Sequence, residues 1–89
     1  MKVEYLPSFL KDLKALKSTP GFEAINALVF EEIPRSTSLG EISSLKRLKG
    51  VDDAYRIRVG DYRIGLFTLK ETITFARVLH RREIYRYFP

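Results

Sequence analysis

The stretch of sequence that decides the fold is YRIRVGDYRIGL, residues 55–66. On both sides of Gly60 and Asp61, apolar side chains alternate with arginines or other residues, which is the two-residue period of a β-strand. A two-residue loop that begins with glycine is typical of a tight hairpin turn, so Val59 is expected to pair with Tyr62. We therefore predict two antiparallel strands joined by this turn.

Counting outward from the turn predicts which residues face each other across the hairpin. Arg58 falls opposite Arg63, and Arg56 falls opposite Gly65; directly paired residues share one face of a sheet. The other face is apolar and consists of Tyr55, Ile57, Val59, Ile64 and Leu66. We expect this apolar face to meet helices, which leaves the three arginines on the open face. Gly65, beside Arg56, is expected to leave a gap where a ligand could approach the sheet closely.

Opposed arginines are unfavourable in a sheet by several tenths of a kcal/mol, roughly, so a fold with no use for them should avoid the arrangement. The planar donor fork of arginine suits phosphate. The hairpin therefore predicts a phosphate-binding surface. The alternative is that the arginines only solvate an exposed face, with acidic partners such as Asp52, Asp53 or Glu83.

The remaining elements follow from the apolar periodicity. Strand alternation covers residues 45–49, 54–59, 62–69 and 72–79, which predicts an antiparallel meander. Residues 2–6 are predicted to form a short first strand, and helical spacing predicts amphipathic helices over residues 8–17 and from Thr19 to Pro34. Thr19 is the expected N-cap of the second helix, Pro20 its first residue, and Pro34 its stop. Residues 35–44 are expected to form a loop or a single helical turn, and residues 82–87 a terminal turn.

The predicted fold class is α+β. An N-terminal strand and a helical hairpin pack on one face of the meander, and a short helix or tail follows at the C-terminus. The length of 89 residues suits one domain, residues 1–89.

Positive charge is concentrated in the second half of the chain. Residues 1–44 carry five basic and six acidic side chains, whereas residues 45–89 carry eleven basic and five acidic ones. Eight of those eleven are arginines. Clustered positive charge of this kind is typical of proteins that bind nucleic acid or another polyanion.

Several classes of protein are disfavoured by composition. There is no cysteine and only one histidine, so neither a disulfide nor a zinc site is predicted, and no motif indicates a cofactor. The N-terminus has no apolar stretch of the kind found in signal peptides, and no apolar run approaches a membrane span. We expect a soluble protein of the cytoplasm.

The C-terminal segment joins arginines to aromatic side chains. Tyrosines next to basic residues suit nucleic acid, because phosphate contacts position the chain while aromatic rings stack on unpaired bases. Phe88 is instead expected to fix the terminus to the core. His80 is the one side chain that ordinarily titrates near neutral pH, and it is a candidate general acid or base, although a lone histidine at a strand end is more often structural.

Three segments together resemble the toxins of the RelE/ParE superfamily, and RelE-like toxins in particular: residues 45–50, LKRLKG; residues 55–64, YRIRVGDYRI; and residues 80–86, HRREIYR. The resemblance spans nearly the whole chain and implies the α+β fold predicted above. It further implies an enzyme without a cofactor that cleaves messenger RNA in the ribosomal A site, where the 2′-hydroxyl attacks the adjacent phosphate. A cognate antitoxin, expected to be a small acidic chain, is the implied protein partner.

The resemblance also implies which residues are catalytic. By position, Arg56 and Arg58 match the two basic residues of the first hairpin strand, Arg63 the arginine of the return strand, Arg81 the basic residue after the last strand, and Tyr85 the C-terminal tyrosine. The surrounding residues expected to contact nucleic acid are Arg47, Lys49, His80, Arg82, Arg86 and Tyr87.

One departure from the family pattern bears on mechanism. The best-known members have lysines where this chain has Arg56 and Arg58, and arginine is a poor general base because it stays protonated. Proton abstraction then falls to Tyr85 or His80, or electrostatic stabilisation dominates. Two alternatives therefore stay open on the same fold: a ParE-like inhibitor of DNA gyrase, and a non-catalytic module held by its antitoxin.

Overall fold

The computed structural model describes residues 1–89 and contains one five-stranded sheet. The strands are β1 (Lys2–Tyr5), β2 (Leu45–Arg47), β3 (Ala54–Val59), β4 (Tyr62–Leu69) and β5 (Thr72–His80), in the spatial order β1-β5-β4-β3-β2. The helical segments are α1 (Pro7–Ala15), α2 (Phe22–Ala27), the π-helical turn η1 (Leu28–Glu32), α3 (Ile33–Arg35), the 3-10 turn η2 (Leu39–Glu41) and α4 (Ile84–Tyr87).

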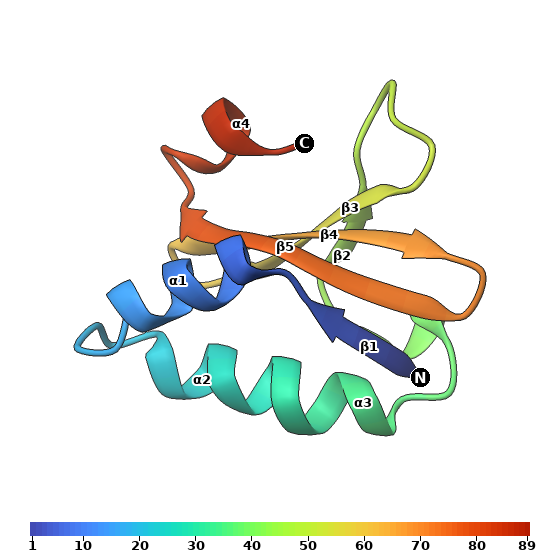
Figure 1. Ribbon diagram of the computed structural model, residues 1–89, viewed down its shortest axis with the longest axis horizontal. Coiled ribbons are helices and arrows are strands. Elements are labelled where there is room, and N and C mark those ends of the chain that lie inside the picture. The colour runs from blue at the N-terminus through green and yellow to red at the C-terminus, as the bar shows by residue number, and fades with distance from the viewer.

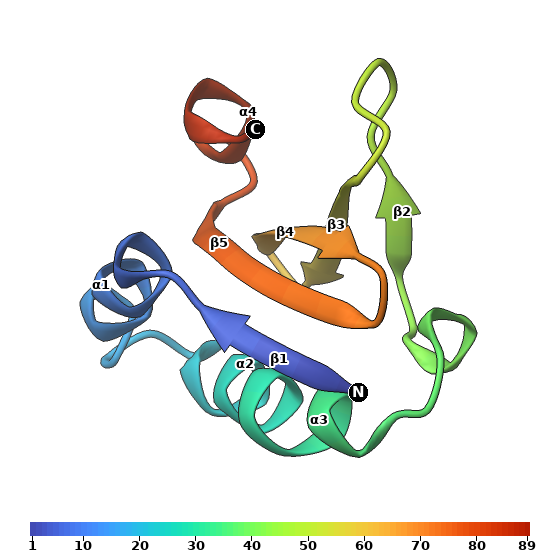
Figure 2. The same ribbon diagram turned by 45° about the vertical axis from the view of Figure 1, so that its right-hand side comes forward.

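Most of the helices lie on one side of this sheet. Figure 1 shows α1, α2 and α3 on one side, and the short α4 on the opposite side. The connection between β2 and β3 stands on the same side of the sheet as α4 (Figure 2). The predicted α+β architecture, with a helical hairpin on one face, is thus confirmed.

The predicted meander is confirmed, since β2 to β5 pair in sequence order and antiparallel. The first strand adds a parallel edge beside β5. After Tyr5 the chain leaves that edge and α1 takes its place: the Ser8 hydroxyl donates to the Ala76 carbonyl at 2.7 Å, and the Asp12 carboxylate accepts from the Val78 amide at 3.1 Å. Side chains of α1 therefore satisfy backbone groups that an edge strand would otherwise expose.

The predicted hairpin register is confirmed at every pair. Val59 pairs with Tyr62, Arg58 with Arg63, and Arg56 with Gly65. Gly60 has φ of +59°, a conformation that favours glycine, as the tight turn requires.

The main core lies between the sheet and α1 to α3. It is formed by Phe9, Leu13, Ile25, Val29, Ile33, Ile42, Ile57, Ile64, Leu66, Ile73, Phe75 and Val78, all buried. The apolar stripes of both predicted helices and the apolar hairpin face supply these side chains. Burial of this face fixes the arginine face outward, because a one-residue slip in register would exchange the two.

Two predicted helix boundaries are wrong. Thr19 is not an N-cap: its hydroxyl donates to the Leu16 carbonyl at 2.7 Å and so closes the end of α1, and α2 begins at Phe22 after Gly21. Pro34 does not end the second helix, which continues to Arg35. A proline ring ordinarily clashes with the carbonyl four residues earlier, and the wider π-helical turn directly before this segment provides the room.

Candidate nucleic-acid interface

Basic side chains form two rows across the face of the sheet opposite α1 to α3. One row runs from Lys46 on β2 to Arg56 on β3, then to Gly65 and Arg77. The second row places Arg58 beside Arg63. We call Lys46, Arg56, Arg58 and Arg63 the basic face.

The three hairpin arginines lack acidic partners. The five ion pairs of the chain involve other arginines, so the predicted alternative, neutralisation by Asp52, Asp53 or Glu83, is not what the structure contains. Asp52 pairs with Arg47, and Glu83 with Arg86. Arg63 donates instead to the backbone carbonyls of Gly60 at 2.9 Å and Tyr62 at 3.0 Å. Its guanidinium is thereby held over the hairpin turn, while its charge stays uncompensated.

Electrostatics link the five predicted catalytic residues at Arg63. Partial burial lowers the pKa of the Arg63 guanidinium, and the positive charges of Arg56 and Arg58 lower it further. Arg81 acts in the same direction, and Tyr85 opposes it. Neighbouring charges lower the pKa of Arg63 in this way only over short distances. The fold therefore brings residues of β3, β4 and the C-terminal segment to one place.

The gap predicted beside Arg56 does not exist. A Cβ atom built on Gly65 would lie 2.5 to 2.8 Å from ring atoms of Phe88, which is only 3% exposed. The expectation that Phe88 fixes the terminus to the core is correct, and its ring is what occupies the space over Gly65. This prediction failed because the occupant lies far along the chain from Gly65.

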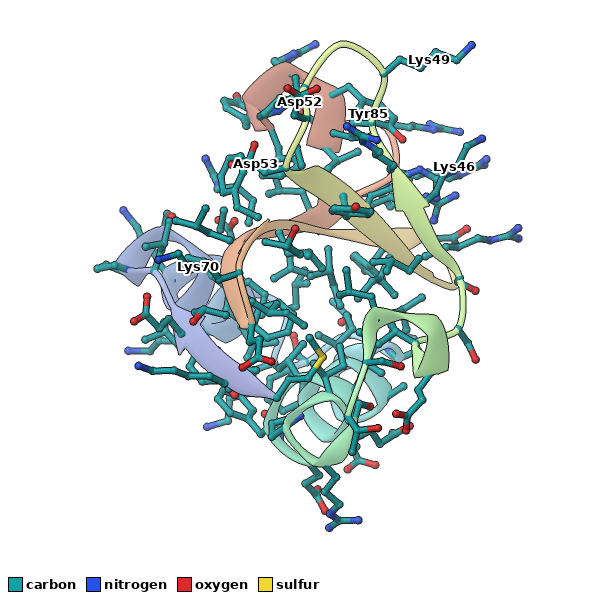
Figure 3. The ribbon with its side chains drawn as sticks, turned by 90° about the vertical axis from the view of Figure 1, so that its right-hand side faces the viewer. Lys46, Lys49, Asp52, Asp53, Lys70 and Tyr85 are labelled. Atoms are coloured by element: carbon teal, nitrogen blue, oxygen red, sulfur yellow. The ribbon has the colours of Figure 1, made fainter.

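Lys46 belongs to the basic face although the sequence reasoning overlooked it. Leu45 pairs with buried Ile57, so Lys46 pairs with Arg56 on the open side. Figure 3 shows Lys46 on β2 and Tyr85 on α4 on the same side of the sheet. Arg47, which was expected to contact nucleic acid, pairs in register with Tyr55 of the apolar side and forms an ion pair with Asp52 at 3.3 Å.

The other predicted contact residues surround the basic face at different places. Lys49 lies exposed in the β2–β3 connection (Figure 3). Arg81 follows β5, where its backbone amide donates to the Asp61 carbonyl at 2.7 Å and its side chain lies 3.7 Å from the Asp61 carboxylate. Arg82 is exposed, Arg86 lies 3.7 Å from Glu83, and the Arg77 guanidinium lies 5.3 Å from the Tyr87 ring centroid.

His80 is separated from the basic face by the sheet. It pairs in register with Tyr62, whose ring packs toward Gly21 on the helical side. The two rings meet edge to face at 5.8 Å, and the His80 Nδ1 accepts from the Arg82 amide at 3.2 Å. His80 is therefore not placed to exchange protons with a ligand held by Arg56, Arg58 and Arg63.

Asp12 and Arg77 form a further charged pair, which could not be predicted from the order of residues along the chain. The Arg77 guanidinium donates to both Asp12 carboxylate oxygens, at 2.6 and 3.0 Å. Hydrogen bonding to Asp12 raises the pKa of Arg77. This pair joins α1 to β5. Arg77 therefore has an acidic partner, unlike Arg56, Arg58 and Arg63.

The structure contains neither a cluster of metal-binding side chains nor a membrane-spanning helix. No three acidic or histidine side chains gather as metal ligands. No helix is long and apolar enough to cross a membrane.

A small α+β protein with an uncompensated basic sheet face beside a C-terminal tyrosine has the architecture of RelE-like toxins, and comparison with known proteins supports this class. The family model for the ParE toxin of the type II toxin–antitoxin system parDE matches residues 3–85. Toxin RelE3 of Methanocaldococcus jannaschii is 46% identical over 91 aligned residues, which cover 100% of both chains. Putative toxin RelE1 of the same organism is 38% identical, covering 91% of this chain and 89% of the relative. The chain belongs to the RelE/ParE superfamily of toxins of toxin–antitoxin systems.

Solved structures agree with this assignment. A chain of the RelB-RelE antitoxin-toxin complex from Methanococcus jannaschii is 44% identical and superposes with a TM-score of 0.75, covering 97% of this chain and 99% of that one. A chain of the Escherichia coli DinJ-YafQ complex, at 17% identity, superposes with a TM-score of 0.74 over 94% of this chain and 97% of the other. The second likeness concerns the fold alone.

Proposed function

We propose that this toxin is an endoribonuclease that cleaves messenger RNA in the ribosomal A site. The observation that carries the proposal is the open sheet face that Arg56, Arg58 and Arg63 share without a carboxylate partner. Like charges directly opposite each other reduce stability, so their presence favours a role in binding an anion. The positive charge of Arg81 also lowers the pKa of Arg63, which supports including the C-terminal segment in this site.

The proposed reaction needs no cofactor. The 2′-oxygen of one nucleotide attacks the adjacent phosphorus, and the bond from phosphorus to the 5′-oxygen breaks. The 2′-proton passes to a base, and the departing 5′-oxygen takes up a proton. The products are a 2′,3′-cyclic phosphate and a 5′-hydroxyl end. The transition state carries extra negative charge on the phosphoryl oxygens, which convergent guanidinium groups stabilise.

Electrostatic stabilisation supplies most of the rate acceleration in this proposal. The arginines remain protonated and cannot act as bases, and His80 lies on the other side of the sheet. Arg56, Arg58 and Arg63 hold the phosphate, and Arg81 neutralises charge that develops on the leaving oxygen. Tyr85 is 58% exposed, so its ring is free to stack on an unpaired base and its hydroxyl to exchange a proton.

We further propose that a cognate antitoxin, a small acidic chain, covers the basic face. Residues 45–89 carry eleven basic and five acidic side chains, which favours such a partner. The similar RelE structure is that of an antitoxin-toxin complex. Action on ribosomes would place the toxin in the cytoplasm.

Expression of the toxin without its antitoxin, followed by mapping of RNA 5′-hydroxyl ends, tests the proposal. New ends within translated messages are expected for the wild type and are expected to be absent for Arg63→Ala and Arg81→Ala, both of which should stay folded. Arg35→Ala is the matched control, because Arg35 is an exposed arginine of α3 that pairs with Glu31. Growth arrest with no new ends, together with altered DNA supercoiling, would instead establish gyrase inhibition.

A further inference from the structure

We infer that Phe88, seated on Gly65, is the positioning residue that holds Tyr85 at the basic face. The inference rests on the proposed function only for its catalytic consequence. The contact itself is between the central strand β4 and the residue that follows α4.

The Phe88 ring can pack directly on β4 only because residue 65 is glycine. A Cβ atom there would come within 2.5 Å of Cγ and 2.6 Å of Cδ2 of Phe88, closer than side-chain carbons pack. The ring also lies against Phe67, with centroids 5.0 Å apart. Ala54, Ala76 and Ile84 complete this second apolar cluster, which is separate from the main core.

Helix α4 depends on this cluster because it cannot be stable alone. It has four residues, far fewer than the roughly 12 to 15 that an isolated helix needs in water. Ile84 and Phe88 are buried on one side, and the Phe88 amide donates to the Ile84 carbonyl at 2.8 Å. Tyr85, between them, is exposed. Two apolar anchors thus fix one turn of helix in an orientation that turns Tyr85 away from the cluster.

The same contact relates α4 to the phosphate site. Gly65 pairs with Arg56 in the sheet, so the Phe88 ring lies next to Arg56 in its row. Tyr85 lies on the same side of the sheet as Lys46 (Figure 3), and Arg63 lies two register pairs closer to the turn than Gly65. The ring over Gly65 therefore sets the place of the tyrosine relative to the arginines. Small displacements of a catalytic group cost about 100-fold in rate for roughly 1 Å, so such positioning matters.

Five variants test the inference: Phe88→Ala, Gly65→Ala, the Gly65→Ala/Phe88→Ala double variant, Tyr85→Phe, and Tyr85→Phe combined with Phe88→Ala. Removing the ring leaves space for a Cβ at residue 65, so the double variant should be no worse than Phe88→Ala alone. Leu69→Ala is the control for loss of an exposed apolar side chain, since Leu69, the last residue of β4, is 72% exposed.

Single-turnover cleavage of ribosome-bound messenger RNA gives the functional readout. Tyr85→Phe should slow the wild type about tenfold or more and slow Phe88→Ala by less than about twofold, because the two substitutions remove the same contribution. Affinity for RNA should change little in Phe88→Ala, since the arginines stay on the sheet. An equal loss from Tyr85→Phe in both backgrounds would overturn the inference.

Nuclear magnetic resonance keeps the test independent of catalysis. The Gly65 α-protons should show a ring-current shift in the wild type that disappears in Phe88→Ala. The Arg63 Nε resonance should respond to Tyr85→Phe in the wild type and not in Phe88→Ala. If the wild type cleaves no RNA, the proposed function fails while these shifts still decide the positioning role. Shifts that persist without the ring would exclude the contact.

Discussion

Arg58 and Arg63 lie directly opposite each other across the β3–β4 hairpin, and neither guanidinium has a carboxylate partner. Side chains directly opposite each other in a sheet are held close together, so two like charges at such positions lower the stability of the fold. The pair is therefore a place where stability and binding make opposite demands on the same residues.

Replacing one of these arginines should separate the two demands. Arg58→Gln is expected to raise the free energy of unfolding by about 0.5 kcal/mol at low salt, because the opposed charge is lost. The gain should shrink at high salt, where screening already weakens the repulsion. RNA cleavage should fall by at least about tenfold. Urea denaturation at two salt concentrations and a cleavage assay measure these effects. Destabilisation by Arg58→Gln would contradict the claim that repulsion between Arg58 and Arg63 lowers the stability of the fold.

The salt dependence of RNA binding should report the number of phosphate contacts. Each arginine that contacts a phosphate of single-stranded RNA contributes about 0.7 to the slope of log affinity against log salt concentration. Arg56→Ala and Arg58→Ala should each reduce the slope by roughly that amount. Arg35→Ala on α3 should leave it unchanged. An identical slope for all three variants would mean that the hairpin arginines do not contact phosphate.

Lys46 should contribute charge to the site. It pairs with Arg56 on β2, and its ammonium has no acidic partner. Lys46→Gln is expected to lower cleavage about fivefold to tenfold, whereas Lys46→Arg should retain most activity because the charge is kept. Lys17→Gln, at an exposed position after α1, is the matched control. Strong loss in Lys46→Arg would instead assign the lysine a role in proton transfer.

The ion pair between Asp12 and Arg77 should be the charged pair that matters most for stability. The Asp12 side chain is 11% exposed and accepts three hydrogen bonds, two from Arg77 and one from Val78. Asp12→Ala should lower the free energy of unfolding by about 2 kcal/mol, because it leaves a cation and a backbone amide unpaired. Glu31→Ala, which breaks an exposed pair with Arg35, should cost less than about 0.5 kcal/mol.

The pH dependence of this pair follows from the sign of the Arg77 shift. Its pKa is raised by Asp12, so the stabilisation is fully present below the unfolded-state pKa and is lost only as the pH rises through the folded-state value. Between about pH 7 and about pH 10, arginine is charged in both states. The difference between wild type and Asp12→Ala in urea denaturation should accordingly stay constant over that range. A decline toward alkaline pH would contradict the assignment.

The hairpin could be predicted from sequence because its order is local. A two-residue turn and strict alternation determine the register of Arg58 and Arg63 without reference to the rest of the chain. The contact between Phe88 and Gly65 could not be predicted, since it depends on how the chain returns over the sheet. Lys46 was not predicted for a related reason. Six residues separate β2 from β3 and leave the register of these strands open, so the side of the sheet on which Lys46 lies could not be obtained by counting.

His80 provides the last test of the proposed mechanism. Its ring packs on Tyr62 on the helical side of the sheet, away from the basic face. His80→Ala should leave the cleavage rate within about twofold of the wild type and leave the shape of its pH profile unchanged, because a group that exchanges no proton in the reaction does not impose its titration on the rate. Tyr85→Phe is the positive comparison and should lower the rate. Cleavage measured from about pH 5.5 to about pH 8.5 covers the ordinary range of histidine titration. A large loss of cleavage in a folded His80→Ala variant, with one limb of the pH profile removed, would assign general acid or base catalysis to His80. The phosphate would then have to bind at the end of β5 instead of over the hairpin.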